Sequence, residues 1–129
     1  MSKETLIWIY GVGYQCFEGH QKEAAFGFFQ MLTLLNPLVS DYWVALGVTQ
    51  RSLSEESDAL YSFEMASLMD SNNPIPIYNS IEIHLKLNQI EEAKKELQLL
   101  KEVIKTHRRD DLQPAFEFIQ GQVQLAKAS

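Results

Sequence analysis

The sequence has few cysteines and few basic residues, and it contains no long apolar run. A single cysteine in 129 residues excludes an internal disulfide and is typical of a reducing compartment. No stretch of 18 apolar residues occurs, so we expect no membrane-spanning helix. The 11 lysines and arginines are outnumbered by 17 carboxylates, which gives a net charge of −6. Such an acidic chain is unsuited to nucleic acid, whose phosphates it would repel.

The start of the chain, residues 1–13, is apolar but does not have the features of a secretory signal. It lacks a basic first segment and a small-residue cleavage site. We therefore expect residues 1–129 to form one domain that begins with a helix.

What the sequence does contain is a period of 34 residues. Small and large apolar residues return at this step, namely Ala25, Ala59 and Ala93, then Phe29, Phe63 and Leu97, and the glycines Gly13 and Gly47. Small and large apolar positions in this order are typical of the tetratricopeptide repeat, a helix–turn–helix unit. Arrays of such units usually bind other polypeptides.

The period predicts three units, each with two antiparallel helices joined by a short turn. The units are 6–39, 40–73 and 74–107. Gly19 is expected to follow the first helix as its left-handed residue. Ser40 or Asp41 is expected to cap the first helix of the second unit.

Residues 111–127 come after the last unit and form the pattern of an amphipathic helix. Its apolar residues recur at three- and four-residue steps, as Leu112, Ala115, Phe116, Ile119 and Val123. A helix of this kind shields the last repeat of a solenoid. We expect Phe116 and Ile119 to bury against the second helix of the third unit. The predicted fold is all-α, with three tetratricopeptide-like repeats and a C-terminal capping helix in a right-handed α-solenoid.

Two stretches carry a more specific likeness. Residues 43–50 read WVALGVTQ and residues 85–93 read LKLNQIEEA. With the ALYSFEMA run at 59–66, they resemble the class II chaperones of bacterial type III secretion. The likeness covers residues about 8–104. It implies a cytoplasmic bacterial protein that holds a hydrophobic secretion substrate without catalysing a reaction.

The predicted binding site is a concave groove lined by the first helix of each unit. Repeat positions 2, 5, 6, 9 and 12 share one helical face. The predicted client-peptide groove residues are Tyr10, Tyr14, Phe17, Val44, Ala45, Val48, Arg51, Tyr78, Asn79 and Glu82. The resemblance implies that a short extended client segment places apolar side chains in this groove.

Some aromatic residues have two interpretations from sequence. Tyr10 and Tyr14 fit the groove and the core of the first unit about equally well. Trp43 occupies the repeat position that packs between helices, and we expect it in the core. Trp8 and Phe26 lie outside the core pattern, so core and interface both stay open for them.

Candidate catalytic or metal-binding groups are few. Cys16 and His20 are four residues apart, a spacing that suits two ligands on one helix face, but no second pair exists. Cys16 and His84 occupy the same repeat position, which favours packing between helices. The Gly11-Val12-Gly13 segment lacks the third glycine of a dinucleotide loop. We predict no enzymatic activity, no metal and no cofactor.

The favoured interpretation is a chaperone that keeps a translocator or needle subunit of type III secretion soluble before secretion. Class II chaperones usually carry a helical extension before the first repeat, whereas only residues 1–5 precede the repeats here. A homodimer therefore stays open. The alternative function is a generic tetratricopeptide adaptor that scaffolds a protein complex unrelated to secretion.

Overall fold

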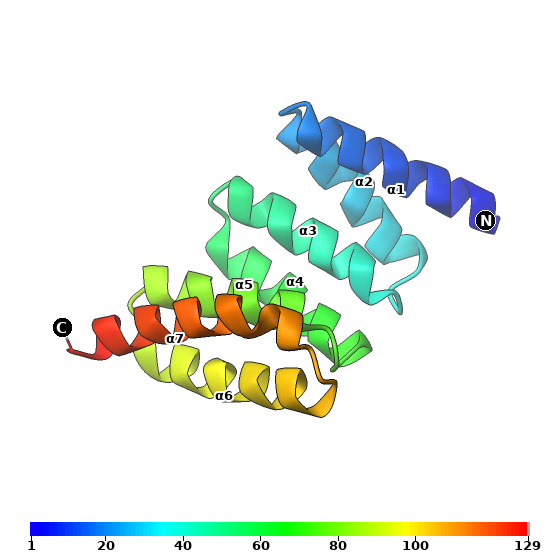
Figure 1. Ribbon diagram of the computed structural model, residues 1–129. Coiled ribbons are helices and arrows are strands. Elements are labelled where there is room, and N and C mark those ends of the chain that lie inside the picture. The colour runs from blue at the N-terminus through cyan, green and yellow to red at the C-terminus, as the bar shows by residue number, and fades with distance from the viewer. Residues whose placement is uncertain (129) are drawn as a thin grey trace. The chain divides into compact units, whose positions relative to one another are not determined.

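The computed structural model describes residues 1–128, and within that range every regular element is a helix (Figure 1). The elements are α1 (Lys3–Glu18), α2 (Lys22–Leu35), α3 (Ser40–Ser52), α4 (Glu56–Met69), α5 (Pro74–Lys86), α6 (Ile90–Thr106), the 3₁₀ turn η1 (Asp110–Leu112) and α7 (Gln113–Ala128). Six repeat helices and one capping helix were expected, so the all-α fold prediction is confirmed. None of the described helices is long and apolar enough to cross a bilayer.

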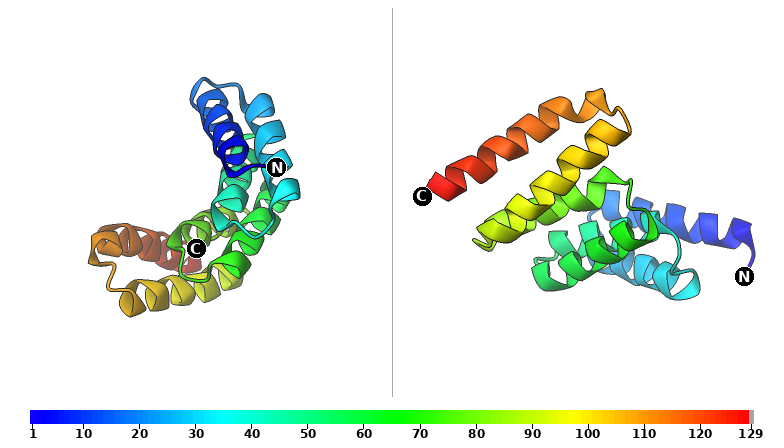
Figure 2. Two further views of the ribbon diagram at one scale, coloured as in Figure 1. Left: turned by 90° about the vertical axis from the view of Figure 1, so that its right-hand side faces the viewer. Right: turned by 90° about the horizontal axis from the view of Figure 1, so that it is seen from below.

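The helices form two compact units, called unit 1 and unit 2, which are distinct from the three 34-residue repeats. Unit 1 is Met1–Met69 and holds α1 to α4, and unit 2 is Asp70–Ser129 and holds α5 to α7. In unit 1, α1 pairs with α2, α3 pairs with α4, and α2 packs against α3. In unit 2, α6 and α7 run antiparallel on either side of the η1 turn, and both pack against α5 (Figure 2). The single domain over 1–129 stays a prediction, and its last residue, Ser129, lies outside the described residues.

The 34-residue period corresponds to the helix pairs. Helix α3 begins at Ser40 and α5 begins at Pro74, which is one period apart. Ala25, Ala59 and Ala93 each have 0% of their surface exposed, one in each helix pair. A larger side chain at these fully buried places would overpack the helix pairs, which accounts for the small residue that the period repeats there.

The first helix of each repeat ends in a left-handed residue that is not glycine. After α1, Gly19 has a φ of −84° and the next residue, His20, has a φ of 63°. The Gln21 N–H donates to the Cys16 carbonyl at 2.8 Å, which is the long hydrogen bond of a Schellman ending. The prediction that Gly19 takes this conformation is wrong by one residue, because Gly19 is the C-cap residue of α1 and the left-handed residue is the one after it.

The same ending recurs one and two periods later. Ser54 has a φ of 62° and Asn88 a φ of 59°. The N–H of Glu55 donates to the Gln50 carbonyl at 2.9 Å, the counterpart of the bond after α1. The backbone of the turn between the two helices of a repeat is therefore repeated, although its side chains are not.

The predicted cap of α3 is also wrong. Val39 occupies the N-cap position, and no side chain makes a capping hydrogen bond there. The Ser40 hydroxyl instead donates to the Ala66 carbonyl of α4 at 2.9 Å. Its hydrogen bond joins the two helices of the second repeat and does not serve the start of α3.

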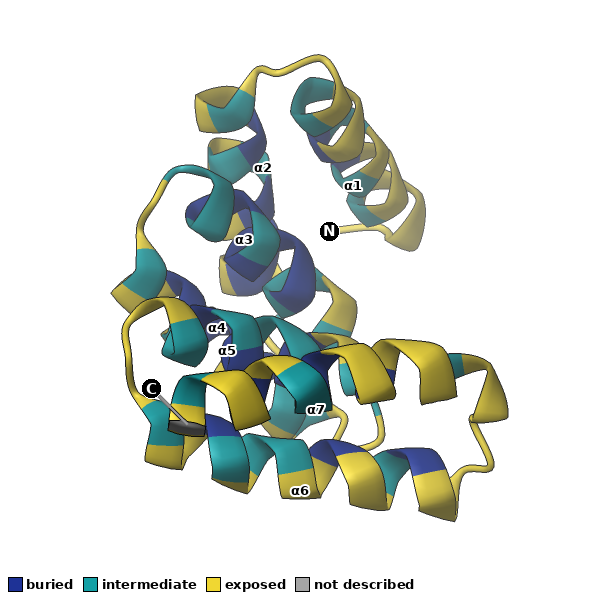
Figure 3. Ribbon diagram, turned by 60° about the vertical axis from the view of Figure 1, so that its left-hand side comes forward, coloured by how far each residue is buried: buried dark blue, intermediate teal, exposed yellow. Residues whose placement is uncertain are grey.

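The C-terminal helix covers the third repeat as predicted. Phe116, Ile119 and Val123 of α7 are all buried, in one cluster with Leu100 and Ile104 of α6. Figure 3 shows this buried side of α7 and its exposed outer side. The apolar stripe that was read from the sequence is thus the face that α7 buries.

A polar contact between paired helices also follows the period. In the second repeat the Ser62 hydroxyl donates to Oε1 of Gln50 at 2.6 Å, and both side chains are buried. In the third repeat the equivalent residues are His84 and Glu96, whose Nδ1 and Oε1 are hydrogen-bonded. The sequence placed His84 at a packing position between helices, and the structure adds the polar partner that it needs there.

Candidate functional site

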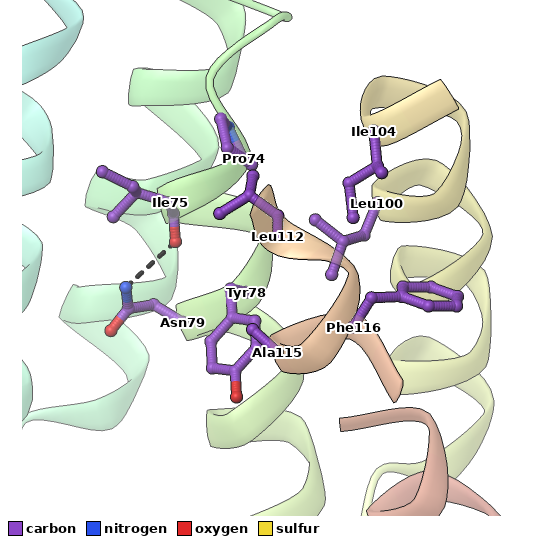
Figure 4. Close-up of a pocket in the computed structure, with 9 residues that line it drawn as sticks. All are labelled: Pro74, Ile75, Tyr78, Asn79, Leu100, Ile104, Leu112, Ala115 and Phe116. Carbon is purple, nitrogen blue, oxygen red and sulfur yellow. Dashed lines mark hydrogen bonds between the residues drawn. The ribbon is translucent and has the colours of Figure 1, made fainter. Parts of the chain in front are cut away.

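An apolar hollow lies in unit 2, between α5, α6 and the start of α7. It has a volume of about 200 Å³. The residues that line it are Pro74, Ile75, Tyr78, Asn79, Leu100, Ile104, Leu112, Ala115 and Phe116. We call it the α5–α7 pocket (Figure 4).

The α5–α7 pocket contains two of the predicted groove residues, Tyr78 and Asn79. The Tyr78 ring lies next to Ala115, between α5 and α7 (Figure 4). The Asn79 amide donates from Nδ2 to the Ile75 carbonyl at 2.9 Å, which holds the side chain against its own helix. The remaining lining is almost wholly apolar, so the pocket suits an apolar side chain of another molecule.

A second hollow adjoins the first and is more polar. It shares Ile104 and Phe116 with the α5–α7 pocket and adds Lys101 and Lys105 of α6. Asp110 and Gln113 complete its lining.

In unit 1 the predicted groove residues Tyr10 and Tyr14 form an aromatic cluster with Phe29 and Tyr42. The Tyr10 and Tyr14 rings meet edge to face, with centroids 4.9 Å apart, and the Tyr10 ring is 5.4 Å from that of Tyr42. The Tyr14 ring lies 5.3 Å from Phe29. Tyr10 packs against the core of unit 1, which fits the core interpretation, while Tyr14 keeps 37% of its surface exposed. The groove interpretation of the two tyrosines stays a prediction.

The two tyrosine hydroxyls are joined. The Tyr10 hydroxyl donates to that of Tyr14 at 3.3 Å. Burial raises the pKa of Tyr10 well above its usual range, and the hydrogen bond to Tyr14 adds to the shift. Tyr10 is therefore a neutral donor at physiological pH, and the exposed Tyr14 hydroxyl is the polar tip of the cluster.

The other predicted groove residues are less exposed to solvent. Val44 and Ala45 are buried, with 8% and 3% of their surface exposed. Phe17 is half-buried and packs against the core of unit 1, and Val48 and Arg51 are half-buried on α3. In unit 2, Glu82 is half-buried on α5. The residues most open to a client are therefore Tyr14 in unit 1 and the pocket around Tyr78 in unit 2.

Sequence reasoning missed the contribution of η1 and α7 to the site. Leu112, Ala115 and Phe116 were assigned to the cap alone, yet they form one wall of the α5–α7 pocket. The sequence did offer one indication of this role. The cap follows the second helix of the third repeat, which is the place where the first helix of a fourth repeat would stand. The first helix of each repeat was predicted to line the groove, so the start of the cap was a candidate for the lining as well.

Cys16 and His20, the pair that the sequence analysis weighed as metal ligands, lie in different surroundings. Within residues 1–128 no three His, Cys, Asp or Glu side chains are grouped to hold a metal ion. Cys16 is partly buried against the core of unit 1, while His20 lies in the turn after α1 and is exposed.

Comparison with known proteins places the fold. No family model matches the sequence. The chain is 25% identical over 104 residues to the low calcium response locus protein H of Yersinia pestis, a match that covers 81% of this chain and 62% of that protein. The same protein of Yersinia pseudotuberculosis matches equally. The chain thus spans less than two thirds of the length of these curated relatives.

Solved structures match over nearly the whole chain. The type III secretion chaperone SycD of Yersinia enterocolitica, in complex with a peptide of the translocator YopD, superposes with a TM-score of 0.90 at 21% identity. That match covers 98% of this chain and 95% of SycD. PcrH, a protein of Pseudomonas aeruginosa, in complex with the chaperone-binding region of PopD, gives a TM-score of 0.81 at 26% identity over 99% of this chain and 92% of PcrH. The chain therefore has the fold of the translocator chaperones of type III secretion, and the resemblance read from its sequence is confirmed.

Proposed function

We propose that this protein is a cytoplasmic chaperone of bacterial type III secretion. It binds a hydrophobic secretion substrate, a translocator or a needle subunit, and keeps that substrate soluble before secretion. The observation that carries the proposal is the α5–α7 pocket, an apolar hollow that contains the predicted groove residues Tyr78 and Asn79. The similarity to SycD, solved with a peptide of the translocator YopD, and to PcrH, solved with the chaperone-binding region of PopD, supports this function over a generic adaptor.

The binding mode follows from the chemistry of the two exposed sites. An apolar client side chain that leaves water for the α5–α7 pocket gains about 25 cal/mol for each Å² of apolar surface buried. In unit 1, Tyr14 offers an aromatic edge and a hydroxyl, a combination that often anchors interfaces. Each site takes part of an extended client segment, and the groove residues of the sequence prediction are proposed to line its path.

No bond of the client has to be made or broken in this function. A chaperone of this kind acts by covering apolar surface that would otherwise aggregate. We propose that the protein is not an enzyme and that its partner is a polypeptide.

The function is tested by capture of the client. The chain, tagged at its C-terminus, is expressed in a bacterium that carries a type III secretion system, and the bound polypeptide is identified by mass spectrometry. We expect a translocator or needle subunit. Capture of an unrelated complex that lacks any secretion substrate would favour the adaptor function.

The site is tested by filling the pocket. Ala115 is exposed on α7 and lines the pocket, so Ala115→Trp adds a ring to the hollow without changing the buried core. We expect client affinity, measured by calorimetry, to fall by about tenfold or more while the melting temperature holds. Ser57→Ala, at the exposed start of α4, is the control and should leave affinity unchanged.

A further inference from the structure

Helix α1 carries one face that no other described part of unit 1 covers. It consists of Trp8, Gly11, Gln15 and Glu18, which follow one another at steps of three, four and three and so share one side of the helix. All four residues are exposed, and Trp8 has 65% of its surface in solvent. We call these residues the α1 outer face (Figure 3).

The equivalent face of α3 is covered. The residues one period later are Tyr42, Ala45, Thr49 and Ser52, and none of them is exposed. Thr49 has 0% and Ala45 3% of its surface in solvent. Helix α2, the second helix of the preceding repeat, packs against α3, and its Lys22 donates from Nζ to the Ser52 carbonyl at 3.3 Å. The face of α3 that corresponds to the α1 outer face is thus covered by a helix, α2.

We propose that the α1 outer face binds an amphipathic helix of a partner protein, which packs on α1 in the way that α2 packs on α3. This surface contains none of the named client-binding residues of the proposed function, although Gly11 stands one period before the predicted groove residue Ala45. The partner helix carries an apolar side that meets Trp8 and Gly11. It also carries a lysine or arginine in its first turn, as α2 does.

Charge specifies the partner helix further. On α3, Lys22 of α2 binds the carbonyl of Ser52. The residue of α1 at the same repeat position is Glu18. A basic residue in the first turn of the partner helix would therefore meet the Glu18 carboxylate. The C-terminal end of α1 adds the negative end of its dipole at the same place. Residues 1–69 hold three lysine or arginine side chains against eight carboxylates. Unit 1 therefore favours a basic helix over an acidic one.

The centre of the α1 outer face has room for a close contact. A Cβ added at Gly11 would meet no atom within 4 Å, so the backbone of α1 is open to an approaching helix. Trp8 stands one turn away and supplies the large aromatic surface that often dominates an interface.

The proposal is tested with a labelled synthetic peptide of residues 21–38, which has the α2 sequence and its first-turn lysine. Binding to the full chain is followed by fluorescence anisotropy. We expect Trp8→Ala and Gly11→Leu each to weaken binding by about tenfold or more. The control Leu99→Ala, at an exposed position of α6, should leave binding unchanged. Circular dichroism of each variant should match that of the original chain.

A charge exchange identifies the place of binding. Glu18→Lys should weaken binding of the peptide by roughly twofold to fivefold, the range of an exposed ion pair, and the peptide with Lys22→Glu should recover it. If the peptide instead replaced α2 on α3, its lysine would meet Ser52 and the Glu18 exchange would have no effect. That result would overturn the proposal.

A second copy of the chain is the competing occupant. Light scattering coupled to size exclusion measures the mass of the full chain over a range of concentrations. Self-association that Gly11→Leu abolishes would overturn the proposal, because the α1 outer face would then be a contact between copies. A monomer that binds the peptide with the expected sensitivity to Trp8 and Glu18 supports it.

Discussion

The Phe63 ring lies directly against the backbone of Gly47. A Cβ added at Gly47 would stand 2.7 Å from Cε1 of that ring, closer than real Cβ atoms come. One period earlier the same relation joins Gly13 and Phe29, with a distance of 2.6 Å. The missing side chain of the glycine is thus the space that the ring fills in each of the first two helix pairs.

The third helix pair differs at these two positions. Where Gly47 and Phe63 stand in the second repeat, the third has Ile81 and Leu97. Ile81 is fully buried, and Leu97 packs against the same core cluster. The third pair therefore has no glycine for a ring to pack on, and it has an aliphatic residue in place of the ring.

The contact between Gly47 and the Phe63 ring predicts the effect of Gly47→Ala. The added methyl group collides with the Phe63 ring, and overpacking of a core typically costs about 1–3 kcal/mol of unfolding free energy. Gly47→Ala combined with Phe63→Leu should recover part of the loss, because the smaller side chain makes room. Urea unfolding of the single and double variants measures the coupling between the two positions.

Gly27→Ala in α2 is the matched control. A Cβ at Gly27 would meet nothing within 4 Å, and alanine is the better helix former by about 0.5–1 kcal/mol. The same substitution should therefore stabilise at one glycine and destabilise at the other. Equal effects at both would contradict the packing described for Gly47.

The turns between paired helices offer a stabilising change. Ser54 holds a left-handed conformation with a φ of 62°, which costs a residue with a side chain roughly 1 kcal/mol relative to glycine. Ser54→Gly should raise the unfolding free energy by a few tenths to about 1 kcal/mol, measured as a higher melting temperature. Ser57→Gly, in the first turn of α4, has ordinary helical geometry and should lower it. A loss of stability at both serines would show that the Ser54 side chain matters more than its backbone.

These turns also show what the sequence could reveal and what it could not. The repeat period located the helix pairs, because each repeat needs a small residue at the buried position that Ala25, Ala59 and Ala93 occupy. The left-handed residue after α1 was misplaced because local preference favours glycine in that conformation, which pointed to Gly19. The conformation falls on His20, one period before Ser54, and the turns after α1 and α3 share the same hydrogen-bonded ending.

The candidate site was predictable to a similar depth. Tyr14, Tyr78 and Asn79 were found because helical periodicity fixes which residues share a face. The pocket wall formed by Leu112 and Ala115 was not predicted, because the 34-residue period stops before α7. The apolar pattern of α7 alone does not show which other helices it packs against. Val44 was placed on the groove face by its repeat position, yet it is buried. The position of a residue on its own helix does not reveal whether a neighbouring helix packs over it.

The Glu96 carboxyl predicts a pH dependence of stability. Burial raises its pKa above the ordinary value of 4.5, although the hydrogen bonds from His84 and Ser80 act in the opposite direction. The folded state then holds the proton more tightly than the unfolded state. The contribution of this group to stability is complete below pH 4.5 and is lost as the pH rises through the raised pKa.

Glu96→Gln should remove that dependence. The amide keeps a hydrogen-bonding group for His84 and cannot ionise, so the unfolding free energy should decline less between acidic and neutral pH. The measurement is urea unfolding at a series of pH values. Glu91→Gln, a change of an exposed carboxylate on the same helix, is the control and should leave the profile unchanged. An unaltered profile for Glu96→Gln would mean that another group causes the dependence.

The last prediction concerns the capping helix. Residues 110–128 contribute Phe116, Ile119 and Val123 to the core of unit 2, where they cover Leu100 and Ile104 of α6. A chain that ends at residue 109 leaves this apolar surface in water and also loses one wall of the α5–α7 pocket. We expect the truncated chain to aggregate or to melt at a much lower temperature. Phe116→Ala is the smaller test, with a cost of about 3–5 kcal/mol as for other buried aromatic residues. Glu117→Ala, the exposed neighbour on the same helix, should have little effect. If the truncated chain stayed soluble with an unchanged melting curve, α7 would not serve as the cap, and its role would lie in client binding alone.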